Sequence, residues 1–312
     1  MPSPHPCDER AAHRSVRSLI ATRPIGGLTA AVVLGAAIIA GCGGSAPSDS
    51  SPAGPDPQHR GPQGNAAQFI VRCTLSHVAF DDPIVLPDQP GESHQHYFFG
   101  NDAVDATPDY DAVSGASTSC AQRLDTASYW APALLDASGA QVAPVGMTAY
   151  YRPGPGVDPA DVVAYPPGLM LIGGDAHAEQ AQSTDVVAWS CGTSAAREVE
   201  PPTCPANSKL RMLVTFPACW DGEHLVSDDA GHTADQTHAV YGTDGCPASH
   251  PVAVPQLQVT IDYPPVDPEG LSLASGSILS GHADFWNVWD QDKLEGEVAD
   301  CLNRDLVCGV SG

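Results

Sequence analysis

The apolar runs of this chain are short, and glycine or proline closes most of them. The sequence contains 30 Gly and 30 Pro, and neither residue fits well inside a long helix or a central strand. The runs are β-branched or alternate with polar residues, as short strands do. They are 69–71, 83–86, 168–172, 185–189, 210–216 and 257–263. This pattern predicts an all-β fold, mainly antiparallel, of the sandwich or jelly-roll kind.

In one segment near the C-terminus, the apolar residues are spaced as in a helix and not as in a strand. Between Asp292 and Leu302, the apolar residues Leu294, Val298 and Leu302 recur at helical spacing, which predicts a short helix. Cys301 is placed to fasten its end. We therefore expect one or two short helices beside the sheets.

The N-terminus has the features of an export signal. Four arginines between Arg10 and Arg23 precede an uncharged stretch whose apolar part, 28–40, is shorter than the roughly 20 residues of a spanning helix. The stretch ends in Ile39-Ala40-Gly41-Cys42, which is typical of a lipoprotein cleavage box. We predict a cleaved signal peptide over 1–41 and a lipid on Cys42. An uncleaved signal anchor is the alternative.

The segment after Cys42 predicts how the rest of the protein is held. Residues 42–68 are rich in Gly, Ser, Pro, Asp and Gln and have few apolar side chains, so we expect a flexible tether. Residues 69–312 are long enough for one β-rich domain. This organisation predicts a protein at the outer face of the cytoplasmic membrane, attached through its lipid alone.

The cysteine count agrees with that compartment. Of ten cysteines, Cys7 lies in the leader and Cys42 takes the lipid, which leaves an even number for disulfides. These are Cys73, Cys120, Cys191, Cys204, Cys219, Cys246, Cys301 and Cys308. Proximity along the chain suggests Cys301 with Cys308 and Cys191 with Cys204, and the other pairings stay open. A cysteine zinc site is disfavoured because no Cys-x-x-Cys pair occurs.

The charge of the chain limits its partners. The formal net charge is −24, and removal of residues 1–41 makes it −26 because four basic and two acidic residues leave. Such a surface repels nucleic acid and anionic lipid headgroups. It suits cations or extracellular glycans, or it serves solubility alone.

Two histidine motifs are the main candidates for a functional site. His94 and His96 are two residues apart, as are His282 and Asp284, and residues with that spacing on a strand face the same side. Neutral imidazoles with a carboxylate suit zinc or another divalent transition metal. We therefore assign His94, His96 and His282 as metal ligands, and these three with Asp284 as catalytic candidates. A single site requires that the two motifs lie close together.

Other interpretations of these histidines remain open. The same residues could act as acid–base groups without metal, or each could hydrogen-bond a backbone group at the edge of a core. The segment 228–232, His238 and His250 offer further donors. A cupin site is disfavoured because Phe99 and Gly100 stand where its glutamate would follow. A histidine-brace copper site is disfavoured because lipidated Cys42 would occupy the N-terminus. Common hydrolase motifs do not occur.

Six short sequence motifs follow one another along the chain, and their order is informative. They are Ser93–Asn101, Ser117–Cys120, Ser128–Pro132, Phe216–Gly222, Cys246–Pro251 and His282–Phe285. In this order the chain resembles the family called domain of unknown function 1996, over nearly all of residues 69–312. The resemblance implies a secreted protein of the kind found in fungi and bacteria, often beside carbohydrate-binding modules. It implies no particular reaction.

Aromatic residues next to these motifs are candidates for a substrate site. Trp286 and Trp289 follow the second histidine motif, and Tyr97 follows the first. Exposed aromatic rings stack on sugars, so we assign these three to substrate binding. Three classes of function remain: an enzyme acting on extracellular polysaccharide, which is the favoured hypothesis, a non-catalytic glycan- or metal-binding surface protein, and a structural or adhesion domain.

Overall fold

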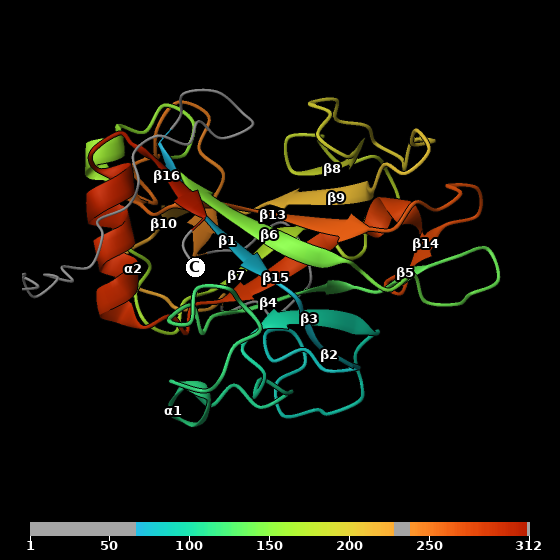
Figure 1. The fold of residues 1–312 in the computed structure, drawn as a ribbon. Helices are drawn as coiled ribbons and strands as arrows, with labels where there is room; N and C mark the ends of the chain where they lie inside the picture. Colours follow the sequence, from blue (N-terminus) through green and yellow to red (C-terminus); the bar gives the residue numbers. More distant parts are fainter. Residues whose placement is uncertain (1–66, 228–237, 311–312) are drawn as a thin grey trace, which may run out of the picture. The chain divides into compact units, whose positions relative to one another are not determined.

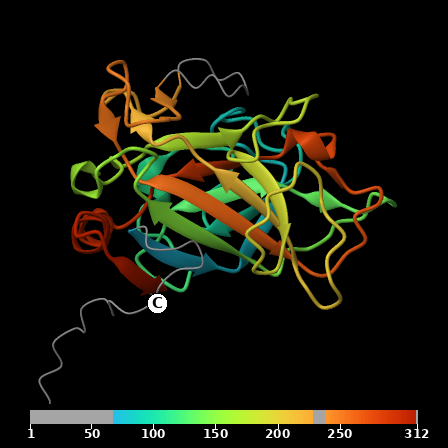
Figure 2. The same cartoon turned by 90° about the horizontal axis from the view of Figure 1, so that it is seen from above.

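The larger of two main sheets has six strands. The computed structural model describes residues 67–227 and 238–310. In spatial order the strands are β16 (Val307–Val310), β1 (Gln68–Cys73), β6 (Gly146–Arg152), β13 (Gln256–Tyr263), β9 (Leu210–Thr215) and β8 (Val187–Cys191). Every neighbouring pair is antiparallel except β1 with β16. Figure 2 looks onto this sheet, with β1 in blue and β13 in orange.

The second main sheet has five strands, all antiparallel. In spatial order they are β2 (Leu75–Ala79), β3 (His96–Gly100), β4 (Ser128–Pro132), β15 (His282–Trp286) and β7 (Met170–Gly174). In Figure 1 this sheet lies below the six-stranded sheet. The order brings β3 and β15 near each other, with only β4 between them, although 181 residues lie between the end of β3 at Gly100 and the start of β15 at His282.

The main core fills the space between the two sheets. On β6, Met147, Ala149 and Tyr151 are buried in this core while Thr148 and Tyr150 alternate with them on the outer face. The five-stranded sheet contributes its own alternate residues, such as Tyr97 and Phe99 from β3, to the same core. Two sheets that share one core are a β-sandwich, as the sequence predicts.

A second, smaller core covers the other face of the five-stranded sheet. Phe98, Trp130 and Trp286 point to this face and pack with Ile84 from the segment between β2 and β3 and with Val113 from the segment between β3 and β4. The second of these segments includes helix α1 (Tyr110–Val113), which lies beneath β3 in Figure 1. The five-stranded sheet is therefore buried on both faces.

Short elements and four disulfides complete the domain. The remaining strands and 3-10 turns are β5 (Leu134–Leu135), β10 (Cys219–Trp220), β11 (Ala239–Val240), β12 (Val252–Ala253), β14 (Ser272–Leu273), η1 (Pro159–Asp161) and η2 (Ile278–Ser280). The disulfides are Cys73–Cys120, Cys191–Cys204, Cys219–Cys246 and Cys301–Cys308. The eight cysteines thus form four disulfides, as predicted, and two of these are the pairs that proximity suggested.

The predicted C-terminal helix is confirmed. Helix α2 (Gln291–Glu297) continues into a π-helical turn, η3 (Val298–Leu302), and Leu294, Val298 and Leu302 are buried. The Asp290 side chain accepts the Lys293 N–H and caps the first turn.

One predicted strand is wrong. Residues 83–86 form a turn, because the N–H groups of Ile84 and Val85 both donate to Asp82 Oδ1 at 3.0 Å. An aspartate that bonds the backbone two and three residues ahead favours a turn over a ladder, and Pro83 offers no N–H to a neighbouring strand.

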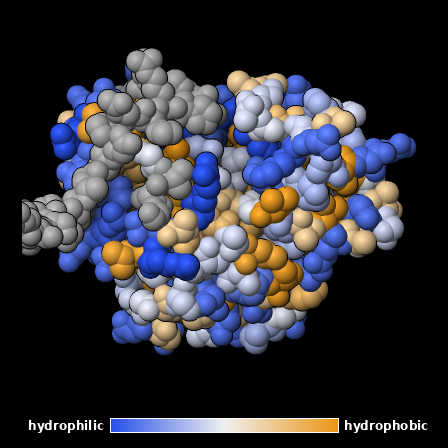
Figure 3. Space-filling model, in the orientation of Figure 1, coloured by the Kyte–Doolittle hydropathy of each residue, from blue (hydrophilic) through white to orange (hydrophobic). Residues whose placement is uncertain are grey.

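Large hydrophobic side chains at the surface are few and scattered. Among the described residues they are Val78, Phe80, Leu124, Val145, Val163, Val199, Leu225 and Val226. On the face seen in Figure 3, hydrophobic residues form separate patches among hydrophilic ones. In the described part of the chain, no helix has the length and apolar character needed to cross a membrane.

Candidate functional site

The two histidine motifs meet where strands β3 and β15 of the five-stranded sheet begin. His96 is the first residue of β3, His282 is the first residue of β15, and His94 lies two residues before β3. One ring nitrogen from each of the three lies within 4.8 Å of the others. His94 Nε2 and His282 Nε2 are 3.2 Å apart. The motifs are thus close enough for a single site.

Strand alternation explains why these side chains converge. On β15, Ala283 and Phe285 belong to the main core, so His282 and Asp284 point to the opposite face. His96 points to that same face of β3, where it pairs with Pro132 at the end of β4. Because β4 stops at Pro132, the side chains from β3 and β15 approach over its end, and the rings of His96 and His282 lie 5.9 Å apart.

Backbone carbonyls fix the orientation of two of the rings. His96 Nδ1 donates to the Asp81 carbonyl at 3.0 Å, and His282 Nδ1 donates to the Ser280 carbonyl at 2.9 Å. A carbonyl can only accept, so each neutral ring carries its proton on Nδ1 and its lone pair on Nε2. Histidines that bind metal ions are commonly held in this way.

Two buried carboxyl groups adjoin the histidines. Asp284 and Asp82 are each 1% exposed, and one oxygen of each lies within 4.8 Å of the other and of a ring nitrogen of His96. Asp284 Oδ2 is 4.0 Å from His282 Nε2, and it makes no hydrogen bond with the described residues. The cluster therefore contains three imidazoles and two carboxyl groups.

Burial makes these carboxyl groups hard to ionise. Burial raises the pKa of Asp284 well above its usual range, and the nearby Asp82 carboxylate adds to that rise. Burial also raises the pKa of Asp82 to about 6, although the N–H groups of Val85 and Ile84 oppose the shift. A cation between the two carboxylates would offset this cost.

Asp82 is not among the site residues that the sequence predicts. It precedes Pro83 in a run interpreted as a strand, and its distance from His94 along the chain matches no ligand spacing. The acidic pair Asp81-Asp82 at the end of an apolar run was the one local signal. Only the pairing of β2 with β3 brings it beside His96.

The three aromatic residues assigned to substrate binding are buried, and that assignment is corrected. Tyr97 is 0% exposed and its hydroxyl donates to the Val142 carbonyl at 3.1 Å. Trp286 and Trp289 are 1% and 2% exposed. Trp286 belongs to the second core, and Trp289 Nε1 donates to the Tyr151 hydroxyl at 3.1 Å. No ring face is available to a sugar, because strand alternation and helix docking place all three inside.

The other predicted donors lie outside the cluster. His238 is buried and its Nε2 donates to the Met170 carbonyl at 2.8 Å, and His250 Nδ1 is 3.0 Å from the Ser249 hydroxyl. The segment 228–232 lies outside the described residues, as do the predicted signal peptide 1–41, Cys42 and the predicted tether up to residue 66.

The comparison with protein families decides the family of this chain. The family model described as "Domain of unknown function (DUF1996)" matches residues 82–289. The chain belongs to the DUF1996 family. The matched range of the DUF1996 domain contains all five residues of the cluster, from Asp82 to Asp284. No curated protein and no solved structure matches the chain.

Proposed function

We propose that this DUF1996 protein binds a divalent transition-metal ion through His94, His96 and His282. The distance of 3.2 Å between His94 Nε2 and His282 Nε2 carries the proposal. Two imidazole nitrogens on a tetrahedral zinc ion, each at about 2.0–2.1 Å, lie about 3.3 Å apart. Asp284 and Asp82 would complete or support the ligand set.

Charge and burial favour metal binding over acid–base catalysis without metal. His96 and His282 are 0% and 2% exposed, so neither can reach a proton on a bulky substrate. Their Nδ1–H groups donate to carbonyls, so Nε2 is the ring atom that can coordinate a cation. A cation would also stabilise two buried carboxylates that otherwise resist ionisation.

Titration with Co²⁺ tests metal binding. The visible absorption of Co²⁺ strengthens when the ion enters a low-symmetry protein site, so the metal-stripped protein should saturate at one ion per chain. His94→Ala/His96→Ala should abolish the signal. His177→Ala/His250→Ala removes two histidines outside the cluster and should leave it unchanged. An equal signal from all three proteins would refute the site.

A catalytic role on extracellular polysaccharide is the second candidate. His94 is half-buried while the other cluster residues are buried, so one side of the ion would be reachable from solvent. Three protein ligands and one open position are the arrangement of catalytic zinc sites, where the ion activates water. Release of reducing ends from a polysaccharide panel by the metal-loaded protein, and not by Asp284→Asn, would support this role. Metal binding without turnover would leave a binding protein.

We also propose that the protein is a surface lipoprotein. The support is the leader pattern, the box ending in Cys42 and the four disulfides, which form outside the cytoplasm. Cys42→Ala should release the protein from the membrane fraction or leave it unprocessed. Unchanged processing and membrane retention of that variant would contradict lipidation at Cys42.

A further inference from the structure

A second candidate site lies on the outer face of the six-stranded sheet, on the other side of the sandwich from the histidine cluster. A cavity of about 920 Å³ runs over β1, β6 and β13. We call it the basic groove and define it by six lining residues: Arg72, Thr74, Arg123, Thr148, Lys209 and Arg211. Arg72, Thr148 and Arg211 are outward-facing residues of β1, β6 and β9, whereas Thr74, Arg123 and Lys209 lie outside the strands.

Positive charge is concentrated in this groove. The described residues include eight Lys and Arg side chains: Arg72, Arg123, Arg152, Arg197, Lys209, Arg211, Lys293 and Arg304. Four of the eight line the groove, where Asp262 is the one acidic residue of the lining and pairs with Lys209 at 2.7 Å. Arg152 lines the adjoining hollow together with Arg211. The chain as a whole has a net charge of −24, so this face is a positively charged patch on an acidic protein.

Beside the groove, Arg197 lies close enough to Arg152 of the adjoining hollow and to Arg211 of the groove for the charges to repel. Burial lowers the pKa of Arg152 to about 10 and the nearby Arg197 lowers it further, against the opposing effect of Tyr150. Burial also lowers the pKa of Arg197, and Arg211 adds to that shift while Asp185 opposes it. A bound anion would relieve this repulsion.

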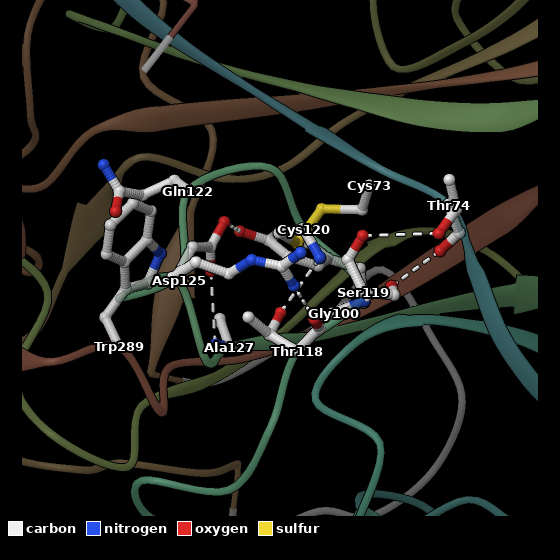
Figure 4. The surroundings of a disulfide bond; sticks show 12 residues. Cys73, Thr74, Gly100, Thr118, Ser119, Cys120, Gln122, Asp125, Ala127 and Trp289 are labelled. Carbon is white, nitrogen blue, oxygen red and sulfur yellow. Dashed lines mark hydrogen bonds between the residues drawn. A yellow bond between two sulfur atoms is a disulfide. The ribbon is translucent and has the colours of Figure 1, made fainter. Parts of the chain in front are cut away.

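Hydrogen bonds hold much of the groove in place. Arg211 Nη2 donates to the Ser190 hydroxyl at 3.1 Å and to the Ser194 carbonyl at 2.7 Å. At the other end Arg123 Nη1 donates to the Thr118 carbonyl at 2.9 Å. Figure 4 shows that this end surrounds the Cys73–Cys120 disulfide. There the Ser119 hydroxyl donates to the Thr74 carbonyl at 2.6 Å. A fixed arrangement of donors lowers the entropy cost of binding.

We propose that the basic groove binds a carboxylate-bearing polysaccharide. Guanidinium groups pair with carboxylates in a two-bond geometry, and the threonine hydroxyls beside them can hydrogen-bond sugar hydroxyls. Nucleic acid is a poorer fit because single strands need aromatic faces for stacking. Tyr150 is the one aromatic residue of the lining, and Arg152 already lies 4.7 Å from the centre of its ring.

Binding of an oligogalacturonate to the full protein tests the proposal. We expect saturable binding by calorimetry and none of a neutral dextran oligomer. Arg72→Gln/Lys209→Gln should weaken binding by about tenfold or more, because two positive charges are lost and Asp262, which pairs with Lys209, is left to repel the ligand carboxylates. Lys293→Gln/Arg304→Gln makes the same charge change outside the groove and should leave the affinity unchanged.

Other outcomes would overturn the proposal. They are no binding of the oligogalacturonate, an equal loss in both double variants, or tighter binding of single-stranded DNA or of phosphatidylglycerol vesicles. The His94→Ala/His96→Ala variant should bind the oligogalacturonate as the parent does, so failure of the metal site and failure of the groove are separate results.

Discussion

At the scale of single residues, the buried carboxyl group of Asp82 most needs an explanation. Its Oδ1 accepts two backbone N–H groups of the turn that follows it, and an asparagine oxygen could accept both. The charge is therefore not required for the turn. We interpret it as part of the proposed metal site, since one oxygen of Asp82 lies within 4.8 Å of a ring nitrogen of His96 and an oxygen of Asp284.

Asp82→Asn tests this interpretation. Removal of one carboxylate beside the ligands should lower metal affinity by about tenfold or more, in the range seen for groups that support metal ligands. Asp81→Asn makes the same change one residue earlier, where the side chain accepts the Gly91 N–H, and should have little effect. Competition with a chromophoric chelator measures both affinities, and equal values for the two variants would exclude Asp82 from the site.

At the scale of elements, the end of β7 positions His282. Gly174 pairs with His282 and has φ +82°. A Cβ there would lie 2.5 Å from the Gly281 carbonyl oxygen and 3.0 Å from His282 Cα. Only glycine fits this approach without a shift of β15.

Gly174→Ala should therefore displace His282. We expect metal affinity to fall by about tenfold or more and stability to fall by about 1–3 kcal/mol. Gly139→Ala is the matched control, because Gly139 has φ +80° and no atom lies within 4 Å of the position that an alanine Cβ would take there. It therefore adds similar backbone strain away from the site. If both variants lost stability but bound metal like the parent, β7 would not position His282.

A buried chain of hydrogen bonds connects the two sheets. Trp289 Nε1 donates to the Tyr151 hydroxyl of β6, which bonds the Tyr129 hydroxyl of β4, which donates to Asp125 Oδ2 at 2.9 Å. Burial raises the pKa of Asp125 well above its usual range, although the bonds from Tyr129 and Ala127 oppose the rise. Trp289 is therefore a core residue that takes part in the connection between the two sheets.

This shift predicts a pH dependence of stability. Because the pKa of Asp125 is higher in the folded than in the unfolded state, its stabilising contribution is complete below the unfolded pKa, about 3.9. That contribution is lost as pH rises toward the folded pKa. Asp125→Asn does not titrate, so its stability relative to the parent should improve as the pH rises above the unfolded pKa. Denaturant unfolding measures the difference, and a constant difference would contradict the shift.

At the scale of the whole molecule, the sequence predicts the sandwich, the final helix and the four disulfides. The first two follow from the local spacing of apolar residues, and the disulfides follow from the even number of cysteines. The site depends on topology. His94 and His96 with His282 and Asp284 were visible as pairs, since alternation along a strand is local. Asp82 and the burial of Trp286 were not, because they depend on which segment covers the five-stranded sheet.

Metal content tests the central proposal most directly. The full protein and His94→Ala/His96→Ala are purified in parallel, incubated with Zn²⁺, Cu²⁺ and Mn²⁺ in turn, desalted and measured by elemental analysis. One tightly held ion per parent chain, and none in the variant, is the predicted result. No retained metal in either protein, or equal metal in both, would contradict a site built on these histidines.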